Sequence, residues 1–240
     1  MKTKLLFSIA LLFCFVKSLI AQTTFTVDNI KYEVTDPISR AVKITGLVDT
    51  EVNSVTIPLT VTNNSKTYNV TAIGDYAFHG YSSLTSVSIS DSVTSIGQYA
   101  FRFCENLNTV SIGNSVTSIG RNAFESCANL TSVSIGNSVT SIGNYAFYDC
   151  KKLTSVSFGN SVSYIGDFAF SYCDNLKSVS IGNSVTYISY AVFSNCKNLK
   201  SVSIGNSVTS IDNRAFEYCN ALTSFTCLAT TPPIISSYSA

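Results

Sequence analysis

The apolar positions of the chain repeat with a period of 23 residues between Val70 and Thr230. Each period follows V-T-S-I-G-x-x-A-F-x-x-C-x-x-L-T-S-V-S-I-G-N-S, and seven such blocks follow one another without a gap. A block of this size is too short to bury its own apolar face. Neighbouring blocks must therefore stack into a solenoid with one continuous core.

The residues around the Leu of each block are predicted to form a β-strand. Leu130, Val133 and Ile135 point to the core, while Ser132 and Ser134 alternate with them and point outward. Because the pattern recurs in every block, we expect the strands to lie parallel, one per coil, at a spacing of about 4.8 Å.

The rest of each block is predicted to hold a second short extended piece and a short helix. Val139 and Ile142 form the extended piece after a Gly-Asn-Ser turn. Ala146, Phe147 and Cys150 then fall at helical spacing. The predicted fold is an α/β repeat solenoid of seven coils, each with a short parallel strand, a second extended piece and a short helix.

These motifs resemble a known repeat family. The L-x-x-V-x-I strand is similar to a leucine-rich repeat, and the added I-G-x-x-A-F-x-x-C-x-x-L resembles the bacterial BspA-like subclass over residues 70–230. The turn Asn of each block lies one place earlier than the common ladder position, so its bonding is not carried over. The resemblance implies a secreted or surface-attached protein used in adhesion or host contact. It implies no ligand site, because the family's motifs are core residues.

Residues 1–21 have the order of a secretory signal peptide. Lys2 and Lys4 precede an apolar run over residues 5–16, and Ala21 offers a small residue before Gln22. The run is shorter than a membrane span, so we predict cleavage after Ala21 rather than insertion into a membrane. The protein is expected to be secreted or attached to the cell surface.

The residues on either side of the repeats break the period. Residues 22–69 carry short alternating runs separated by turn-forming residues, which predict two or three strands in hairpins. They are expected to form a β-rich N-terminal cap over the first coil. Residues 231–240 are expected to be an incomplete C-terminal segment without a cap.

The charge balance excludes several classes of partner. The chain has 15 Lys and Arg against 14 Asp and Glu, and loss of residues 1–21 removes Lys2, Lys4 and Lys17, which leaves 12 against 14. This balance gives no basic patch for nucleic acid and no cationic cluster for a membrane surface. We therefore expect neither as a partner.

Cysteine recurs once per block from the second block to the seventh. In an exported protein this number suggests disulfides. However, equivalent residues of stacked parallel coils point the same way, and each Cys lies among core positions where a thiol serves as a small apolar filler. We expect a column of reduced, buried thiols, and no zinc site, since one ligand per coil does not converge on a point. The six residues are Cys104, Cys127, Cys150, Cys173, Cys196 and Cys219.

The sequence predicts no enzyme, no cofactor and no metal site. His79 is the only histidine, and we expect it at a solvated position of the coil rather than as a general base. Glu105 and Asp174 share a repeat position but lie three coils apart, about 14 Å by strand spacing, which is too far for a glycosidase pair. The residues equivalent to His79 are Arg102, Glu125, Tyr148, Ser171, Ser194 and Glu217.

Two surfaces could bind a partner, and the first is the outer face of the sheet. Small hydroxyl side chains cover it in columns, and a neighbouring column is more varied. Such an array could contact an extended polypeptide, a glycan or ice, but we favour the interpretation that it solvates a regular sheet. The varied column is Thr85, Asn108, Thr131, Thr154, Lys177, Lys200 and Thr223.

The second surface carries tyrosine. Partly exposed Tyr is well suited to anchor a protein or to stack on a sugar, although the rings could equally shield the core. We predict the binding patch in the coils that hold Tyr164, Phe168, Tyr172, Tyr187 and Tyr190.

Two functions remain open from the sequence. The first is an exported protein that mediates adhesion or protein–protein contact with an extracellular host or matrix protein, with a glycan as a further possibility. The second is a structural spacer that displays a terminal domain. Irregular Tyr and Lys positions favour the first function, and the near-identical Ser-Val-Ser-Ile-Gly-Asn-Ser blocks favour the second.

Overall fold

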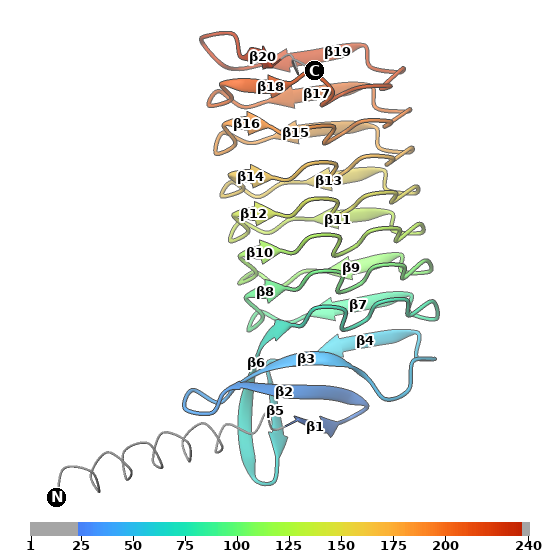
Figure 1. Cartoon of the computed structure of the whole chain (residues 1–240), viewed down its shortest axis with the longest axis vertical. Helices are drawn as coiled ribbons and strands as arrows, with labels where there is room; N and C mark the ends of the chain where they lie inside the picture. Colours follow the sequence, from blue (N-terminus) through green and yellow to red (C-terminus); the bar gives the residue numbers. More distant parts are fainter. Residues whose placement is uncertain (1–23, 237–240) are drawn as a thin grey trace, which may run out of the picture.

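The computed structural model describes residues 24–236, and it shows coils stacked along one long axis (Figure 1). The predicted solenoid of seven coils of about 23 residues is confirmed. Each regular coil contributes one strand to each of two columns, and a run of turns connects them. The signal peptide predicted for residues 1–21 lies outside the described residues. Within the described part, no helix is long and apolar enough to cross a bilayer.

The first column is formed by the strands predicted around the Leu of each block. Equivalent residues pair in parallel register, so Val133 faces Val156 across neighbouring coils. Val133 and Ile135 are buried while Ser132 and Ser134 are exposed, which confirms the predicted alternation. The strands are β7 (Ser86–Ile89), β9 (Thr109–Ser111), β11 (Ser132–Ser134), β13 (Ser155–Ser157), β15 (Ser178–Ile181), β17 (Ser201–Ile204) and β19 (Ser224–Cys227).

The second column contains the short extended pieces. Most are two residues long and place one Ile in the core, as Ile142 does. Their ladder runs on into the last residues, where Ile235 pairs with Ile211. Residues 231–236 therefore add a strand, which the sequence did not predict. The strands are β6 (Lys66–Ile73), β8 (Ser95–Ile96), β10 (Ser118–Ile119), β12 (Ser141–Ile142), β14 (Tyr164–Ile165), β16 (Tyr187–Ile188), β18 (Ser210–Asp212) and β20 (Ile234–Ser236).

The predicted short helix is wrong, because residues 24–236 contain no helix. Each coil closes with consecutive turns. Tyr145 and Asp149 lie four residues apart with φ of 60° and 59°, and the left-handed region interrupts a right-handed helix at both places. The backbone N–H of Tyr148 donates within the coil to Tyr145, whereas that of Phe147 donates to Ala169 of the next coil at 2.7 Å. The spacing of Ala146, Phe147 and Cys150 therefore correctly indicated that these side chains point into the core, but it did not indicate a helical backbone.

The N-terminal cap has more strands than the two or three expected. Strands β1 (Thr24–Val27), β2 (Ile30–Asp36) and β3 (Ala41–Leu47) form an antiparallel meander, and β5 (Thr60–Asn63) forms a hairpin with β6. Strand β4 (Ser54–Ile57) pairs in parallel with β7, while β6 pairs in parallel with β8. Both columns thus begin inside the segment assigned to the cap, whose boundary at residue 69 stays a prediction.

Two pairs of turn asparagines form hydrogen bonds between neighbouring coils. The side-chain Oδ1 of Asn137 accepts a hydrogen bond from the backbone N–H of Asn160 at 3.1 Å, and Asn183 accepts from Asn206 at 3.0 Å. One side chain therefore satisfies a backbone donor of the following coil, which ties successive turns together.

The core is a stack of identical side chains. One Phe per coil is buried, and neighbouring rings lie nearly parallel with centroids 4.9 Å apart for Phe78 and Phe101 and 5.1 Å apart for Phe124 and Phe147. This column runs through the solenoid beside the buried Leu, Val and Ile. Its rings are those of Phe78, Phe101, Phe124, Phe147, Phe170, Phe193 and Phe216.

The cysteine column lies beside the Phe rings. All six repeat cysteines are buried free thiols, while Cys227 in β19 is exposed. Each buried Sγ donates to the carbonyl oxygen of the Phe 26 residues earlier; Cys127, for example, donates to Phe101 at 3.2 Å. Burial raises the pKa of Cys104 to about 12 and that of Cys127 well above its ordinary value. The thiols of Cys104 and Cys127 are therefore protonated at neutral pH, whereas the hydrogen bond with Cys196 lowers the pKa of Cys219.

Candidate interaction surfaces

Aromatic side chains from three consecutive coils meet on the turn side of the solenoid. The Tyr145 and Phe168 rings stack with centroids 4.8 Å apart, and Tyr190 meets Phe168 edge-on at 5.1 Å. Tyr148 contacts Tyr145 at 5.6 Å and Tyr172 at 5.3 Å. We call Tyr145, Tyr148, Phe168, Tyr172 and Tyr190 the aromatic cluster.

The local backbone explains why these rings stay outside the core. Tyr145, Phe168 and Tyr172 have φ between 56° and 60°, in the left-handed region. A residue in this conformation reverses the direction of the chain, so the following Ala146 and Phe147 enter the core while the Tyr145 ring remains partly exposed. The 23-residue spacing of Tyr145 and Phe168 then brings the two rings face to face.

The five residues predicted to bind divide into two groups. Phe168, Tyr172 and Tyr190 belong to the aromatic cluster. Tyr164 and Tyr187 lie on β14 and β16 in the second strand column, 48% and 39% exposed. Their hydroxyls donate to Asn144 Oδ1 and Asp212 Oδ2, each at 3.2 Å.

The prediction omitted the two rings that connect the aromatic cluster, Tyr145 and Tyr148. One signal was available in the sequence, because Tyr145 occupies the repeat position of Phe168 one coil earlier. The contact of Tyr148 with Tyr172 joins different repeat positions and depends on side-chain directions that spacing alone does not give.

Cations flank the aromatic cluster at both ends. The Arg121 guanidinium lies 5.8 Å from the Tyr145 ring centroid, and Arg214 Nη1 donates to the Tyr190 hydroxyl at 3.0 Å. Burial, together with the neighbouring Tyr172 and Asp149, raises the pKa of Tyr148 above its ordinary value. Its hydroxyl therefore stays a hydrogen-bond donor at neutral pH.

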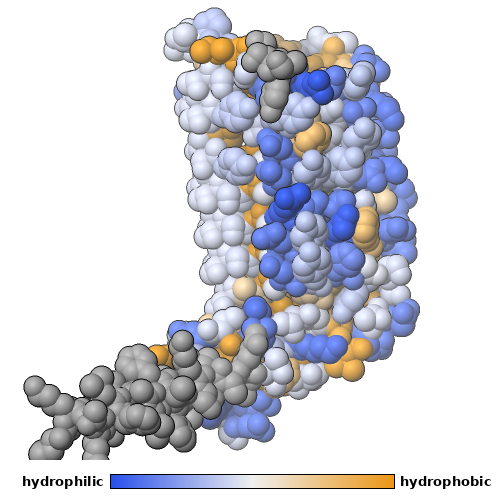
Figure 2. Space-filling view, in the orientation of Figure 1, coloured by the Kyte–Doolittle hydropathy of each residue, from blue (hydrophilic) through white to orange (hydrophobic). Residues whose placement is uncertain are grey.

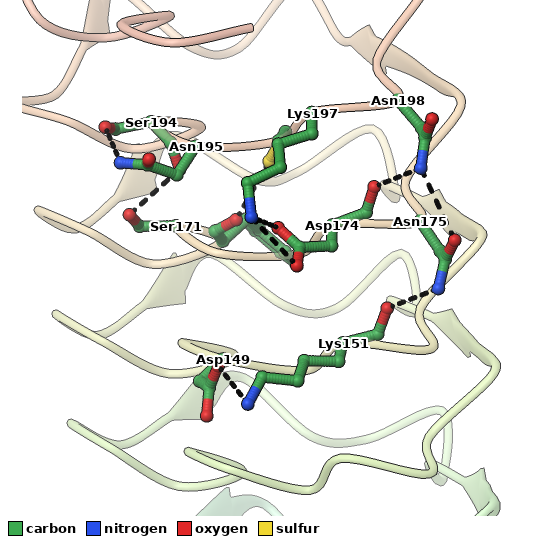
Figure 3. A network of polar contacts seen from close by, with 11 residues as sticks. Asp149, Lys151, Ser171, Asp174, Asn175, Ser194, Asn195, Lys197 and Asn198 are labelled. Carbon is green, nitrogen blue, oxygen red and sulfur yellow. Dashed lines mark hydrogen bonds and ion pairs between the residues drawn. The ribbon is translucent and has the colours of Figure 1, made fainter.

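His79 is not at a freely solvated position. Its ring is half-buried, with centroid distances of 5.7 Å to both Tyr76 and Phe103. The expectation of exposure is wrong for the equivalent Glu125, Ser171 and Ser194, which are buried. The reason is that this position faces the next coil: Ser171 Oγ donates to the Ser194 carbonyl oxygen at 2.9 Å (Figure 3).

The buried Glu125 is held by an ion pair. Arg102 donates to its carboxylate through Nε at 2.6 Å and Nη2 at 3.0 Å, and Asn122 Nδ2 donates to Oε2 at 2.5 Å. The guanidinium also lies 4.2 Å from the Phe103 ring centroid. These contacts fix Arg102 and Glu125 between two coils, which gives the pair a structural role.

The outer sheet face is flat and uniform. The Ser side chains of the first column follow one another in register, and Ser157 Oγ donates to Ser134 Oγ at 3.3 Å. Figure 2 shows a pale column of near-neutral hydropathy along the side of the solenoid where Figure 1 labels β8 to β16, beside a strip of strongly hydrophilic side chains. The hydroxyl side chains keep the outer sheet face well solvated.

The arrangement of the titratable side chains bears on metal binding. In the part of the chain that is described, no cluster of three or more His, Cys, Asp or Glu could hold a metal ion. The His79 ring contacts are to aromatic side chains, and of the two acids that influence the pKa of Tyr148, Asp149 pairs with Lys151 and Glu125 with Arg102.

Comparisons with known proteins identify the repeat. The chain matches the BspA type leucine-rich repeat region in six copies, over residues 49–151, 71–197 and 117–238. A leucine-rich repeat protein from Bacteroides ovatus is 33% identical over 84% of this chain, with a TM-score of 0.77. This chain covers 52% of that protein, about half its length. The T. pallidum leucine-rich repeat protein is 28% identical, with a TM-score of 0.70; the match covers 84% of this chain and 91% of that one. No curated protein matches.

Proposed function

Because the chain belongs to the BspA-type leucine-rich repeat family, we propose that it is an exported protein that binds an extracellular protein through the aromatic cluster. The observation that carries this proposal is the contact of five rings from three coils on one exposed side. Four of these five residues are partly exposed and Tyr172 is exposed, so a partner can cover the rings together.

The geometry of the aromatic cluster suits a protein partner. Tyrosine and arginine are the side chains enriched at the energetic centres of protein interfaces. Here stacking already holds Tyr145 and Phe168 in place, so binding immobilises few additional rotamers and costs less conformational entropy. Tyr172, 40% exposed, supplies ring surface that a partner can cover.

The export part of the proposal rests on residues 1–21. We expect the secreted or surface-attached protein to begin at Gln22, because cleavage follows the small side chain of Ala21. Amino-terminal sequencing of the protein recovered from the cell surface or the medium tests this expectation. Recovery from the cytoplasm with Met1 still present would contradict export.

A structural spacer is the second candidate function. The repetitive Ser and Thr face favours it, since a spacer needs a rigid, solvated body and no binding patch. A spacer gives no saturable signal in a binding screen, whereas an adhesive protein does.

A screen of the exported chain against matrix and plasma proteins by biolayer interferometry tests the proposed function. We expect a saturable protein partner whose affinity falls when Tyr148, Tyr172 and Tyr190 of the aromatic cluster are all replaced by alanine, with the circular dichroism spectrum unchanged. Binding that survives the triple replacement would place the partner on another surface. An empty panel would favour the spacer.

A further inference from the structure

A polar groove lies beside the start of the first strand column, away from the aromatic cluster. Its volume is about 420 Å³, and every lining residue is an amide, a hydroxyl or a lysine. The amide, hydroxyl and ammonium groups of these side chains match the hydroxyl groups of a sugar chain. The lining residues are Thr85, Asn106, Asn108, Asn129, Thr131 and Lys152.

Two columns of side chains form the walls of this polar groove. Asn129 precedes the buried Leu130 and Thr131 follows it, and the same two positions line the groove in the neighbouring coils. Along the axis, the position after the Leu is occupied next by Thr154 and then by Lys177 and Lys200. The columns therefore extend from the polar groove to these lysines.

The coils that contain Leu153, Leu176 and Leu199 carry five lysines, and within the described part of the chain only two of these lysines form an ion pair. Lys151 pairs with Asp149, and Lys197 with Asp174, each at 3.4 Å (Figure 3). Three further exposed lysines have no ion pair within residues 24–236, and they lie on three consecutive coils. These are Lys152, Lys177 and Lys200.

Two of these lysines are adjacent. The backbone N–H of Lys200 donates to the Lys177 carbonyl oxygen at 2.9 Å, which puts the two residues side by side on neighbouring coils. Like charges in directly adjacent positions repel each other. The other five coils have Thr or Asn at this position and avoid the repulsion: Thr85, Asn108, Thr131, Thr154 and Thr223. An anionic ligand would turn the repulsion into attraction.

Hydrogen bonds already fix the groove walls. Asn129 Nδ2 donates to Asn106 Oδ1 at 3.0 Å, and Thr131 Oγ1 donates to the Asn108 carbonyl oxygen at 3.3 Å. The Thr131 oxygen keeps lone pairs for a ligand hydroxyl. We propose that the polar groove binds an acidic glycan, with sugar hydroxyls on the Asn and Thr side chains and carboxylate or sulfate groups on Lys152, Lys177 and Lys200.

A double substitution with a matched control tests the acidic glycan site. The exported chain is titrated with an oligogalacturonide, a sialylated oligosaccharide and a heparin oligosaccharide, followed by a neutral oligosaccharide of similar length. Lys177→Gln/Lys200→Gln should raise the Kd of the acidic ligand that binds by about two- to thirtyfold, the range spanned by two exposed ion pairs. The control Lys31→Gln/Lys66→Gln removes the same charge from exposed cap lysines and should leave the Kd unchanged.

Four outcomes would overturn the proposal: no saturable binding of any acidic oligosaccharide, equal affinity for the neutral one, an equal loss in the control variant, or no loss in the double substitution. An oligoglutamate peptide is tested alongside. If it binds more tightly than every glycan and is weakened by the same double substitution, the partner is an acidic polypeptide. Because the aromatic cluster is untouched in both variants, the result does not depend on the proposed protein partner.

Discussion

Replacing Phe147 with alanine is expected to lower the free energy of unfolding by about 3–5 kcal/mol. The side chain is fully buried at the centre of the solenoid, and its ring stacks at 5.1 Å on both Phe124 and Phe170. Its removal leaves a cavity and breaks two ring contacts. In a stacked repeat, coils on both sides lose an interface at once. Urea denaturation followed by circular dichroism measures the change.

Tyr218→Ala serves as the control for this substitution. Tyr218 is 61% exposed and occupies the turn side of the last regular coil. Its replacement should cost less than about 1 kcal/mol, in the range of surface substitutions. Similar losses for Phe147 and Tyr218 would mean that the Phe column does not carry the stability of the solenoid.

The protein is expected to lose stability steeply above about pH 9, because of its buried thiols. Burial raises the pKa of Cys104 from its ordinary value of 9.0 to about 12, and it also raises those of Cys127, Cys150, Cys173 and Cys196. Above pH 9 the unfolded chain releases thiol protons that the folded chain retains, so unfolding becomes more favourable. Each thiol contributes about 1.4 kcal/mol per pH unit until the pH reaches its folded pKa.

The size of the alkaline effect follows from the number of thiols. Because the hydrogen bond between Cys196 and Cys219 shifts their pKa values in opposite directions, the sum counts only Cys104, Cys127, Cys150 and Cys173, and these four thiols predict a loss of about 4 kcal/mol between pH 9 and pH 10. Urea midpoints measured at pH 8, 9 and 10 under reducing conditions test this prediction. The variant Cys127→Ala/Cys150→Ala/Cys173→Ala should show a shallower decline with pH. An equal slope in the variant would assign the alkaline sensitivity to other groups.

The core of this fold could be predicted from the sequence because it depends on position alone. Val133, Ile135, Ile142 and Phe147 are buried as their spacing indicates. The helix could not be excluded in the same way. Residues such as Tyr145 carry no glycine signal for a left-handed φ, and the hydrogen bonds that replace the helix run to the next coil. Inter-coil bonding of this kind is invisible to local propensity.

The surface was harder to predict than the core. The exposed Tyr164 and Tyr187 were found because they replace Ser, but the aromatic cluster is defined by ring contacts between different repeat positions, such as that of Tyr148 with Tyr172. The burial of Glu125 also depends on a contact between coils. The sequence predicted an exposed position for this residue, but its ion pair with Arg102 of the preceding coil stabilises the buried carboxylate. Contacts between coils decide both features.

The most direct test of the proposed function compares two double variants against the protein partner that the screen identifies. Tyr148→Ala/Tyr172→Ala removes two rings of the aromatic cluster, while Tyr76→Ala/Tyr218→Ala removes two exposed tyrosines outside it. We predict that the first variant raises the Kd at least about tenfold, as expected for tyrosines at the centre of an interface, and that the second leaves it unchanged. An unchanged Kd in the first variant, or an equal rise in both, would contradict a binding role for the aromatic cluster.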